Sequence, residues 1–401
     1  MNKRNILIIT PFFFPERISS GRYNTILASE LARCGCAVTV ICSHPLYPTW
    51  NPHRTTEALH NITAVRAGAW VRYPKGNVLK RVVLESWFSI HAIISTFRLR
   101  GVAKSVIIVF PPVMFAPVIR SLLPKAVPIV GIVHDLQGIM AKTKSGTVRK
   151  AVSKTITIIE RRAFQSCTSI IALSEGMRGA IIDDYKIDAE IVSVIYPFAQ
   201  LGTVATKEPL GIFDQTCRNV VYAGALGEKQ MPELLLSVME EVVSLRPNVR
   251  CYVFSEGPAF KELKARAKRT DRISFHSLVK EKELASLYAG STVQIIPQAP
   301  ETGAGAFPSK LPNLVVTGTP LFAVCEHNSE LDELVKRLSC ARTSYEKTAQ
   351  LIAKDLLSFL NDVAEMSHTK CAEGNQTVLQ ELFSVQCLMD KLHSTLERPP
   401  C

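Results

Sequence analysis

Two loops in the second half of the chain combine glycines with a lysine. Gly224 and Gly227 precede Lys229 in the first loop, and a glycine-rich stretch ends in Ser309 and Lys310 in the second. Glycines allow backbone N–H groups to converge on an anion, and a lysine adds a full positive charge there. Both loops are therefore candidate sites for a phosphate or diphosphate group. A surface loop with an exposed lysine is the alternative for each.

A histidine and an aspartate, His134 and Asp135, follow an apolar run at 127–133. A histidine at the end of a strand can hydrogen-bond a hydroxyl group or exchange a proton near neutral pH, and a purely structural turn is the alternative. No GxGxxG, P-loop or DxD pattern occurs, and no carboxylate pair has the spacing of an acid and a nucleophile. Dinucleotide-binding, NTPase and glycosidase functions therefore lose support.

The 11 cysteines are scattered singly, and no CxxC pair marks a metal site. Several of them lie inside apolar runs, where cysteine behaves as a small core residue. We therefore expect reduced thiols in a cytosolic protein, and no bound metal.

Alternating strands and helices are predicted to hold these loops. A strand over 5–10, a helix over 23–33 and a strand over 37–41 form a βαβ unit, and this alternation recurs, lapses over 199–217 and then restarts. We predict an α/β protein with two Rossmann-like, doubly wound domains that face each other across a cleft. Ligands of such sheets bind at the carboxyl ends of the strands, where the candidate loops lie. The predicted parts are an acceptor-side domain (1–200), a nucleotide-sugar-binding domain (201–377) and a closing helix (378–401) that packs back on the first domain.

The formal net charge of +12 is carried by the first half of the chain, where cations flank an apolar segment at 86–97. Such a pattern is typical of a helix lying in an anionic lipid surface, and a core helix with solvated flanks is the alternative. No uncharged run is long enough to span a membrane, and no nucleic-acid reader motif occurs. We predict a cytoplasmic protein, peripheral on the inner face of the cell membrane. The predicted membrane-surface residues are Lys75, Lys80, Arg81, Trp87, Phe88, Arg98, Arg100 and Lys104.

The order of these strand-end segments resembles that of the family-4 retaining glycosyltransferases of the GT-B fold, over nearly the whole chain. The segments VHDLQ, IALSEGMR and VSVIYPF carry the resemblance in the first half, and YAGALGEKQ, FSEGP, FHSLVKEKELASLY and FPSKLPNLVVTGTPLFAV carry it in the second. The combination of GEKQ with PSKL resembles the bacterial exopolysaccharide subgroup of colanic-acid type. That subgroup assembles repeat units on a polyprenyl-diphosphate lipid.

This resemblance implies a retaining, metal-independent transfer of a hexosyl or deoxyhexosyl group. The donor would be a UDP- or GDP-linked sugar acting as co-substrate, without a further cofactor, and the acceptor a lipid-linked saccharide. His134 and Asp135 would be catalytic and face the reacting sugar. Lys310 is predicted to be the strongest donor contact, ahead of Lys229. The donor-binding residues that the resemblance implies are Gly21, Gly224, Gly227, Lys229, Gly257, Leu278, Val279, Ser309, Lys310, Leu311, Asn313 and Glu330.

One departure from the family pattern leaves a different function open. Relatives carry two glutamates eight residues apart before a Gly-Thr-Pro sequence, and these positions hold Gly305 and Asn313 here. Glu301, Glu326 and Glu330 are candidate substitutes. The alternative is a non-catalytic relative that binds a nucleotide-sugar or scaffolds an assembly.

Overall fold

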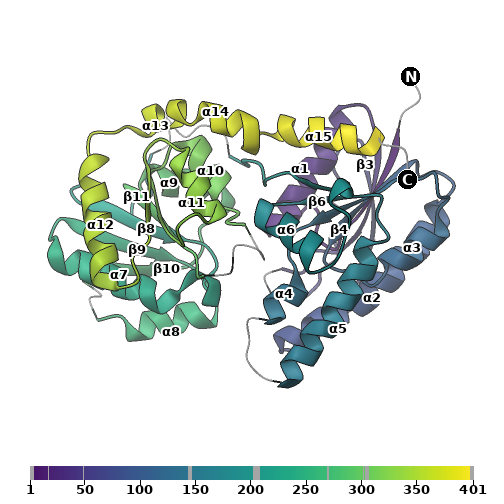
Figure 1. Cartoon of the computed structure of the whole chain (residues 1–401), viewed down its shortest axis with the longest axis horizontal. Coiled ribbons are helices and arrows are strands. Elements are labelled where there is room, and N and C mark those ends of the chain that lie inside the picture. The colour runs from purple at the N-terminus through teal and green to yellow at the C-terminus, as the bar shows by residue number, and fades with distance from the viewer. Residues whose placement is uncertain are drawn as a thin grey trace. The chain divides into compact units, whose positions relative to one another are not determined.

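The computed structural model of the chain describes residues 4–16, 18–47, 49–142, 147–201, 208–268, 271–300, 302 and 307–397. The chain forms two compact units, each built on its own parallel sheet (Figure 1). Met1–Pro197 and Gln386–Cys401 belong to the first unit. Phe198–Gly303 and Pro308–Val385 make up the second unit.

The first unit contains a 7-stranded parallel sheet in the order β3-β2-β1-β4-β5-β6-β7. Its strands are β1 (Asn5–Ile9), β2 (Ala37–Ser43), β3 (Ile62–Ala67), β4 (Ser105–Phe110), β5 (Ile129–Val133), β6 (Ser169–Ala172) and β7 (Val192–Val194). Its helices are α1 (Ser19–Arg33), α2 (Asn77–Leu99), α3 (Ala116–Leu122), α4 (Gln137–Lys142), α5 (Thr147–Phe164), α6 (Glu175–Asp183), η1 (Ala189–Ile191) and α15 (Val385–Glu397).

The second unit contains a 6-stranded parallel sheet in the order β10-β9-β8-β11-β12-β13. Its strands are β8 (Arg218–Ala223), β9 (Val249–Phe254), β10 (Ile273–His276), β11 (Val293–Pro297), β12 (Leu321–Val324) and β13 (Ala341–Ser344). Its longer helices are α7 (Pro232–Leu245), α8 (Pro258–Arg266), α9 (Leu284–Ala289), α10 (Leu311–Thr317), α11 (Glu330–Lys336), α12 (Ala349–Asp362) and α13 (His368–Gly374). Its short turns are η2 (Glu228–Gln230), η3 (Glu281–Glu283), α14 (Gln376–Val378) and the π-helix η5 (Leu379–Phe383).

Each sheet reverses its strand order at one place, and that place is a ligand-binding position in folds of this kind. The reversal lies between β1 and β4 in the first sheet, and between β8 and β11 in the second. The predicted pair of Rossmann-like, doubly wound units is thereby confirmed.

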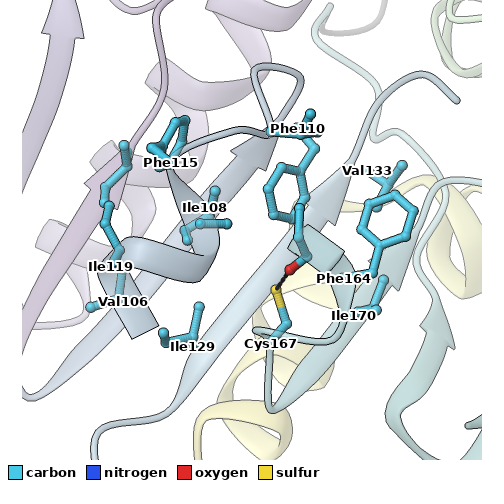
Figure 2. Close-up of a cluster of buried hydrophobic side chains, with 14 of the residues drawn as sticks. Val106, Ile108, Phe110, Phe115, Ile119, Ile129, Val133, Phe164, Cys167 and Ile170 are labelled. Atoms are coloured by element: carbon cyan, nitrogen blue, oxygen red, sulfur yellow. Dashed lines mark hydrogen bonds between the residues drawn. The ribbon is translucent and has the colours of Figure 1, made fainter. Parts of the chain in front are cut away.

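The first core lies around the two central strands of the first sheet. Every residue of β4 and β5 is buried, and Figure 2 shows Val106, Ile108 and Phe110 of β4 beside Ile129 and Val133 of β5. Parallel strands with both faces covered by helices read as continuous apolar runs rather than alternating ones. The uncharged run at 105–110 is therefore the buried strand β4.

Helix α2 packs two of its three large aromatic side chains, Trp87 and Phe88, into this core. The side chain of Trp87 is 8% exposed and that of Phe88 is 0% exposed, and Phe88 meets Phe115 edge-on at a ring distance of 5.9 Å. The prediction that Trp87 and Phe88 lie on a membrane surface is therefore wrong. They occupy the face of α2 that the sheet covers, because the helical period separates that face from the exposed one.

By length and composition alone, one helix among the described residues could cross a membrane. It is Val78–Leu99 in α2, and 39% of its most apolar window is buried inside the protein. No uninterrupted uncharged run has this length in the sequence, because Lys80, Arg81 and Glu85 interrupt the apolar residues. The structure joins the apolar segment and its charged flank into a single helix of 23 residues.

The end of the chain is divided where one closing helix was expected. The π-helix η5 ends before Ser384, whose extended backbone separates it from α15. Residues 376–383 belong to the second unit, and residues from 386 onward belong to the first. In the first unit, Lys391 Nζ of α15 donates to the carbonyl oxygen of Val194 in β7 at 3.2 Å.

Two of the cysteines form a disulfide bond, so the expectation of reduced thiols is wrong for this pair. Cys340 comes directly before β13, and Cys371 lies in α13, 31 residues further along the chain. A pair so far apart in sequence carries no spacing signal, and only the packing of α13 beside the start of β13 brings the sulfur atoms together.

Candidate active site

A cavity of about 260 Å³ opens at the carboxyl end of the first sheet, beside the reversal between β1 and β4. Thr10 follows β1, Pro111 follows β4, and His134 and Asp135 follow β5. Helices α1 and α2 supply Ser20, Asn24, Arg81 and Glu85, and Gln137 of α4 and Tyr47 are further polar residues of the lining. The structure thus places both predicted catalytic residues on the wall of one cavity.

His134 is held against the sheet and is electrically neutral. Its backbone N–H donates to the carbonyl oxygen of Phe110 at 3.0 Å, and its ring meets that of Tyr23 edge-on at 4.9 Å. The Nε2 atom is buried and has no hydrogen-bond partner among the described residues. Burial lowers the pKa of His134 to about 4. At neutral pH the ring can therefore hydrogen-bond a hydroxyl group, but it does not carry a positive charge.

Asn24 is a polar residue of this cavity that sequence reasoning missed. Its Nδ2 atom donates to Thr10 Oγ1 at 2.8 Å and to the carbonyl oxygen of Phe12 at 2.9 Å. The side chain is 0% exposed, and its Oδ1 atom has no hydrogen-bond partner in the described part of the chain. The sequence signal was only an amide within the buried face of a helix.

Glu85 of α2 was also missed. Its two carboxyl oxygens accept the backbone N–H of Val113 at 2.9 and 3.1 Å, which joins α2 to the segment after β4. Burial raises the pKa of Glu85 to about 7, although these backbone donors oppose the shift. Arg81 stands four residues earlier and lines the same cavity. The available signal was that Glu85 is the one acidic residue in the sequence of this helix, because a carboxylate is costly to bury without a partner.

In the second unit, Lys310 lies at the reversal between β8 and β11. Its Nζ atom donates to the carbonyl oxygen of Ile295 in β11 at 2.9 Å and to that of Ala223 in β8 at 3.4 Å. The same atom lies 4.4 Å from the centre of the Tyr222 ring. Burial lowers the pKa of Lys310 to about 7. The ammonium group therefore sits beneath the strand ends instead of extending from the start of α10.

The loop after β8 is joined to the loop after β11. Gly224 has a φ of 142°, which favours glycine, and the Tyr222 hydroxyl donates to the carbonyl oxygen of Ala225 at 2.5 Å. The N–H of Gly227 donates to Gln230 Oε1 at 3.1 Å. Backbone Ala299 N–H donates to the carbonyl oxygen of Lys229 at 2.8 Å. The predicted donor loops around Lys229 and Lys310 are thus brought to the same strand ends.

Other predicted donor residues also lie at the carboxyl edge of the second sheet. Gly257 follows β9 with a φ of 101°, and Leu278 and Val279 follow β10, where Leu278 is 43% exposed. Ser309 is exposed just before α10. Leu311 is 0% exposed and belongs to the buried core, so it does not line an open site.

Two predicted positions, Asn313 and Gly21, have structural roles of their own. Asn313 Oδ1 accepts the backbone N–H groups of Gln200 at 2.8 Å and Leu201 at 3.1 Å, so its oxygen binds the chain itself. A Cβ atom on Gly21 would lie 2.9 Å from the carbonyl oxygen of Glu16, which explains the glycine by packing. Glu330 is the first residue of α11 and is half-buried.

The other two candidate substitutes for the missing glutamates are not placed in a site. Glu326 is exposed after β12, and Glu301 lies outside the described residues, as does Gly305. Among the residues that the structure describes, no group of three His, Cys, Asp or Glu side chains could hold a metal ion.

Residues 20–201 match the model of the family described as Glycosyltransferase Family 4. The fold is that of the GT-B glycosyltransferases. Sucrose-phosphate synthase from Thermosynechococcus elongatus has a TM-score of 0.75 to this chain at 15% identity, over 98% of this chain and 99% of that one. WaaG, a glycosyltransferase involved in lipopolysaccharide biosynthesis, has a TM-score of 0.67 at 13% identity, over 98% and 97%.

A glycosyltransferase from Rickettsia africae has a TM-score of 0.64 at 13% identity, over 99% of this chain and 98% of that one. No curated protein sequence matches the chain. The match to the glycosyltransferase family model supports glycosyl transfer as the activity.

Proposed function

We propose that the protein transfers a hexosyl or deoxyhexosyl group from a UDP- or GDP-linked sugar to a lipid-linked saccharide in bacterial exopolysaccharide or surface polysaccharide synthesis. The observation that carries the proposal is the environment of Lys310. Its buried ammonium group contacts two carbonyl oxygens and an aromatic face at a sheet reversal, and no acidic side chain pairs with it in the described part of the chain. A cation without a counter-ion at such a position suits an anionic ligand.

The chemistry proposed for this site follows from where charge develops. When the bond from the anomeric carbon to the diphosphate oxygen breaks, negative charge builds up on the departing nucleoside diphosphate. A buried cation stabilises that charge more strongly than an exposed one, because little water competes with it. Neutral His134 would hydrogen-bond a hydroxyl group of the reacting sugar. The proposal includes retention at the anomeric carbon and independence of a metal ion.

A panel of nucleotide-sugars tests this function. UDP- and GDP-linked glucose, galactose, mannose and fucose are added to the full chain, and the melting temperature is recorded. A ligand that binds only the folded state raises it, by an amount that grows with concentration. We expect one nucleotide class to stabilise the protein and to release nucleoside diphosphate when a polyprenyl-diphosphate-linked sugar is supplied. Stabilisation without turnover on any acceptor would favour the non-catalytic alternative, and no stabilisation would contradict the proposal.

We also propose that the first unit docks on the cytoplasmic face of an anionic membrane. Helix α2 exposes a row of apolar side chains at intervals of three to eight residues, although Trp87 and Phe88 face inward. The row consists of Val78, Val82, Ile90, Ile94 and Phe97, which are 75, 54, 61, 46 and 49% exposed. Arg81, Arg98 and Arg100 are exposed on the same helix or just beyond it, and the Arg100 guanidinium lies 4.0 Å from the Phe97 ring centre. An apolar row with flanking cations is the composition of an interfacial helix.

The neighbouring helices also expose apolar side chains. In the first unit, α3 contacts both α2 and α5. Met114, just before α3, and Val118 within it are 53 and 42% exposed, and Ile158 of α5 is 46% exposed. Exposed apolar side chains on three helices that contact one another favour a docking role.

Replacing Ile90 and Ile94 together by aspartate should lower recovery on anionic vesicles by about tenfold or more, because each change removes an apolar contact and adds a repelled charge. Flotation with vesicles of phosphatidylglycerol and phosphatidylcholine measures this. Leu351→Asp is the matched control, since Leu351 is a 43% exposed apolar residue on α12 of the second unit. Recovery of the wild type should fall at high salt. Equal recovery on neutral and anionic vesicles at both salt concentrations would contradict the proposal.

A further inference from the structure

We propose that Asn24 binds one hydroxyl group of a sugar ring in the cavity of the first unit, and that this contact selects among sugars that differ at that hydroxyl. The inference rests on the proposed function, since the ring belongs either to the sugar being transferred or to the acceptor saccharide. Both of these candidates are neutral sugar rings whose hydroxyl groups can donate a hydrogen bond.

The orientation of the Asn24 amide is determined by its partners. A carbonyl oxygen can only accept a hydrogen bond, so the group that faces the carbonyl oxygen of Phe12 at 2.9 Å must be the NH₂ group. The second contact of this NH₂ group, with Thr10 Oγ1 at 2.8 Å, fixes the side chain further. The Oδ1 atom is consequently the remaining polar atom of the side chain, and it can only accept.

That oxygen is buried without a hydrogen-bond donor among the described residues, in a side chain that lines the cavity. Buried polar groups in folded proteins almost always have a partner, so an orphaned one at a cavity wall indicates that the partner arrives with a ligand. A second atom of the same wall, His134 Nε2, is orphaned in the same way. Two such atoms from α1 and from the end of β5 point to a ligand with more than one hydroxyl group.

The rest of the wall suits a neutral ring better than a phosphate. Trp50 and Tyr47 also line it, and aromatic rings pack well against the C–H face of a sugar. Glu85 and Asp135 contribute two carboxyl groups to the lining, and Arg81 contributes one guanidinium group. An anionic group in this cavity would meet these acidic side chains, whereas hydroxyl groups can donate to them.

A comparison of sugars and variants isolates the contact. Binding of methyl glucoside, methyl galactoside and methyl mannoside to the full chain is measured by saturation-transfer NMR titration, followed by the monodeoxy analogues of the strongest binder. We expect one deoxy analogue to bind the wild type at least tenfold more weakly than its parent. Asn24→Leu has a similar shape without the amide, and it should bind parent and analogue equally. Comparing both sugars with both proteins forms a double-mutant cycle. The cycle measures the contact between Asn24 and the hydroxyl group separately from other effects of the substitution.

Thr10→Val is the matched control. It removes the hydrogen bond from Asn24 Nδ2 to Thr10 Oγ1, but it leaves Asn24 Oδ1 in place, so the preference for the parent sugar should persist. The melting temperature of each variant verifies folding. Should Asn24→Leu not fold, Asn24→Ser replaces it, because serine lacks the Oδ1 atom and still offers a donor.

A further measurement distinguishes whether the ring belongs to the transferred sugar or to the acceptor saccharide. Kinetics with deoxy nucleotide-sugars and deoxy acceptors show which substrate carries the Asn24-dependent preference. The inference is overturned if a folded Asn24 variant discriminates as the wild type does, or if the wild type binds none of the glycosides. Absence of turnover with every nucleotide-sugar would contradict the proposed function instead, and would leave the sugar-binding result intact.

Discussion

Lys310→Met should weaken binding of UDP or GDP by about ten- to a hundredfold. A charge-assisted contact to phosphate is worth about 1.5–3 kcal/mol, and each 1.4 kcal/mol is a factor of ten. Methionine keeps an unbranched apolar side chain of similar length, so the change removes mainly the ammonium group. Isothermal titration with the nucleoside diphosphate measures the loss, and binding of the nucleoside alone should be nearly unchanged.

The same lysine predicts how affinity depends on pH. Burial lowers the pKa of Lys310 to about 7 in the unliganded protein, so half of the molecules carry an uncharged amine at that pH. A bound diphosphate favours the charged form and raises the pKa. Binding above pH 7 must therefore take up a proton, and affinity should fall as pH rises from 7 to 9.

Lys310→Met should lack this pH dependence, and Lys229→Ala, which leaves Lys310 in place, should retain it. If Lys310→Met binds the diphosphate as tightly as the wild type, the donor site lies elsewhere. A pH-independent affinity of the wild type would show that the ammonium group does not meet the phosphates.

His134→Ala should lower turnover by about 100-fold, with a much smaller effect on donor affinity. Removing one hydrogen bond that strengthens in the transition state costs roughly that much in kcat. The ring is neutral because its pKa is about 4, so the contact is a hydrogen bond to a hydroxyl group and not a charge. Turnover should accordingly show no titration of this histidine between pH 6 and 8. Steady-state kinetics with the donor identified by the nucleotide-sugar panel provide the measurement.

His134→Gln is the conservative comparison, because its amide can place a polar atom near the position of Nε2. It should recover part of the lost turnover, whereas His134→Ala should not. The functional role of His134 would be excluded by a folded His134→Ala protein with wild-type turnover. A protein that does not melt cooperatively would assign His134 a structural role through its contact with the Tyr23 ring.

Much of the fold could be predicted from the sequence, because parallel strands that are buried on both faces form short apolar runs between loops. The run SVIIVF at 105–110 and the run at 129–133 are β4 and β5. The loops after such strands fall at the carboxyl edge of the sheet, which is why His134 and Gly224 could be located in advance. The composition of α2 also indicated an apolar helix with basic flanks.

The function of polar residues within helices could not be predicted in this way, because it depends on the direction in which each side chain points. Asn24 and Glu85 resemble ordinary helix positions in the sequence, and they reach the cavity only because α1 and α2 pack against the sheet at particular rotations. The same rotation buries Trp87 and Phe88 and exposes Ile90 and Ile94, so the prediction of a membrane-facing position is wrong for the two aromatic residues. A rotation of this kind is set by contacts with distant strands, and local pattern does not determine it.

The sequence by itself determined the two doubly wound units and the loops that carry the candidate phosphate ligands, since both depend on local runs of apolar residues, glycine and lysine. Only the tertiary structure determined the protonation state of Lys310 and the pairing of the cysteines. Lys310 becomes a weakly basic group because burial among residues from different strands removes water from its ammonium group and lowers its pKa. Cys340 and Cys371 become a disulfide because α13 packs beside β13. Charge and redox state depend on what surrounds an atom, and residues far apart in the sequence supply those surroundings.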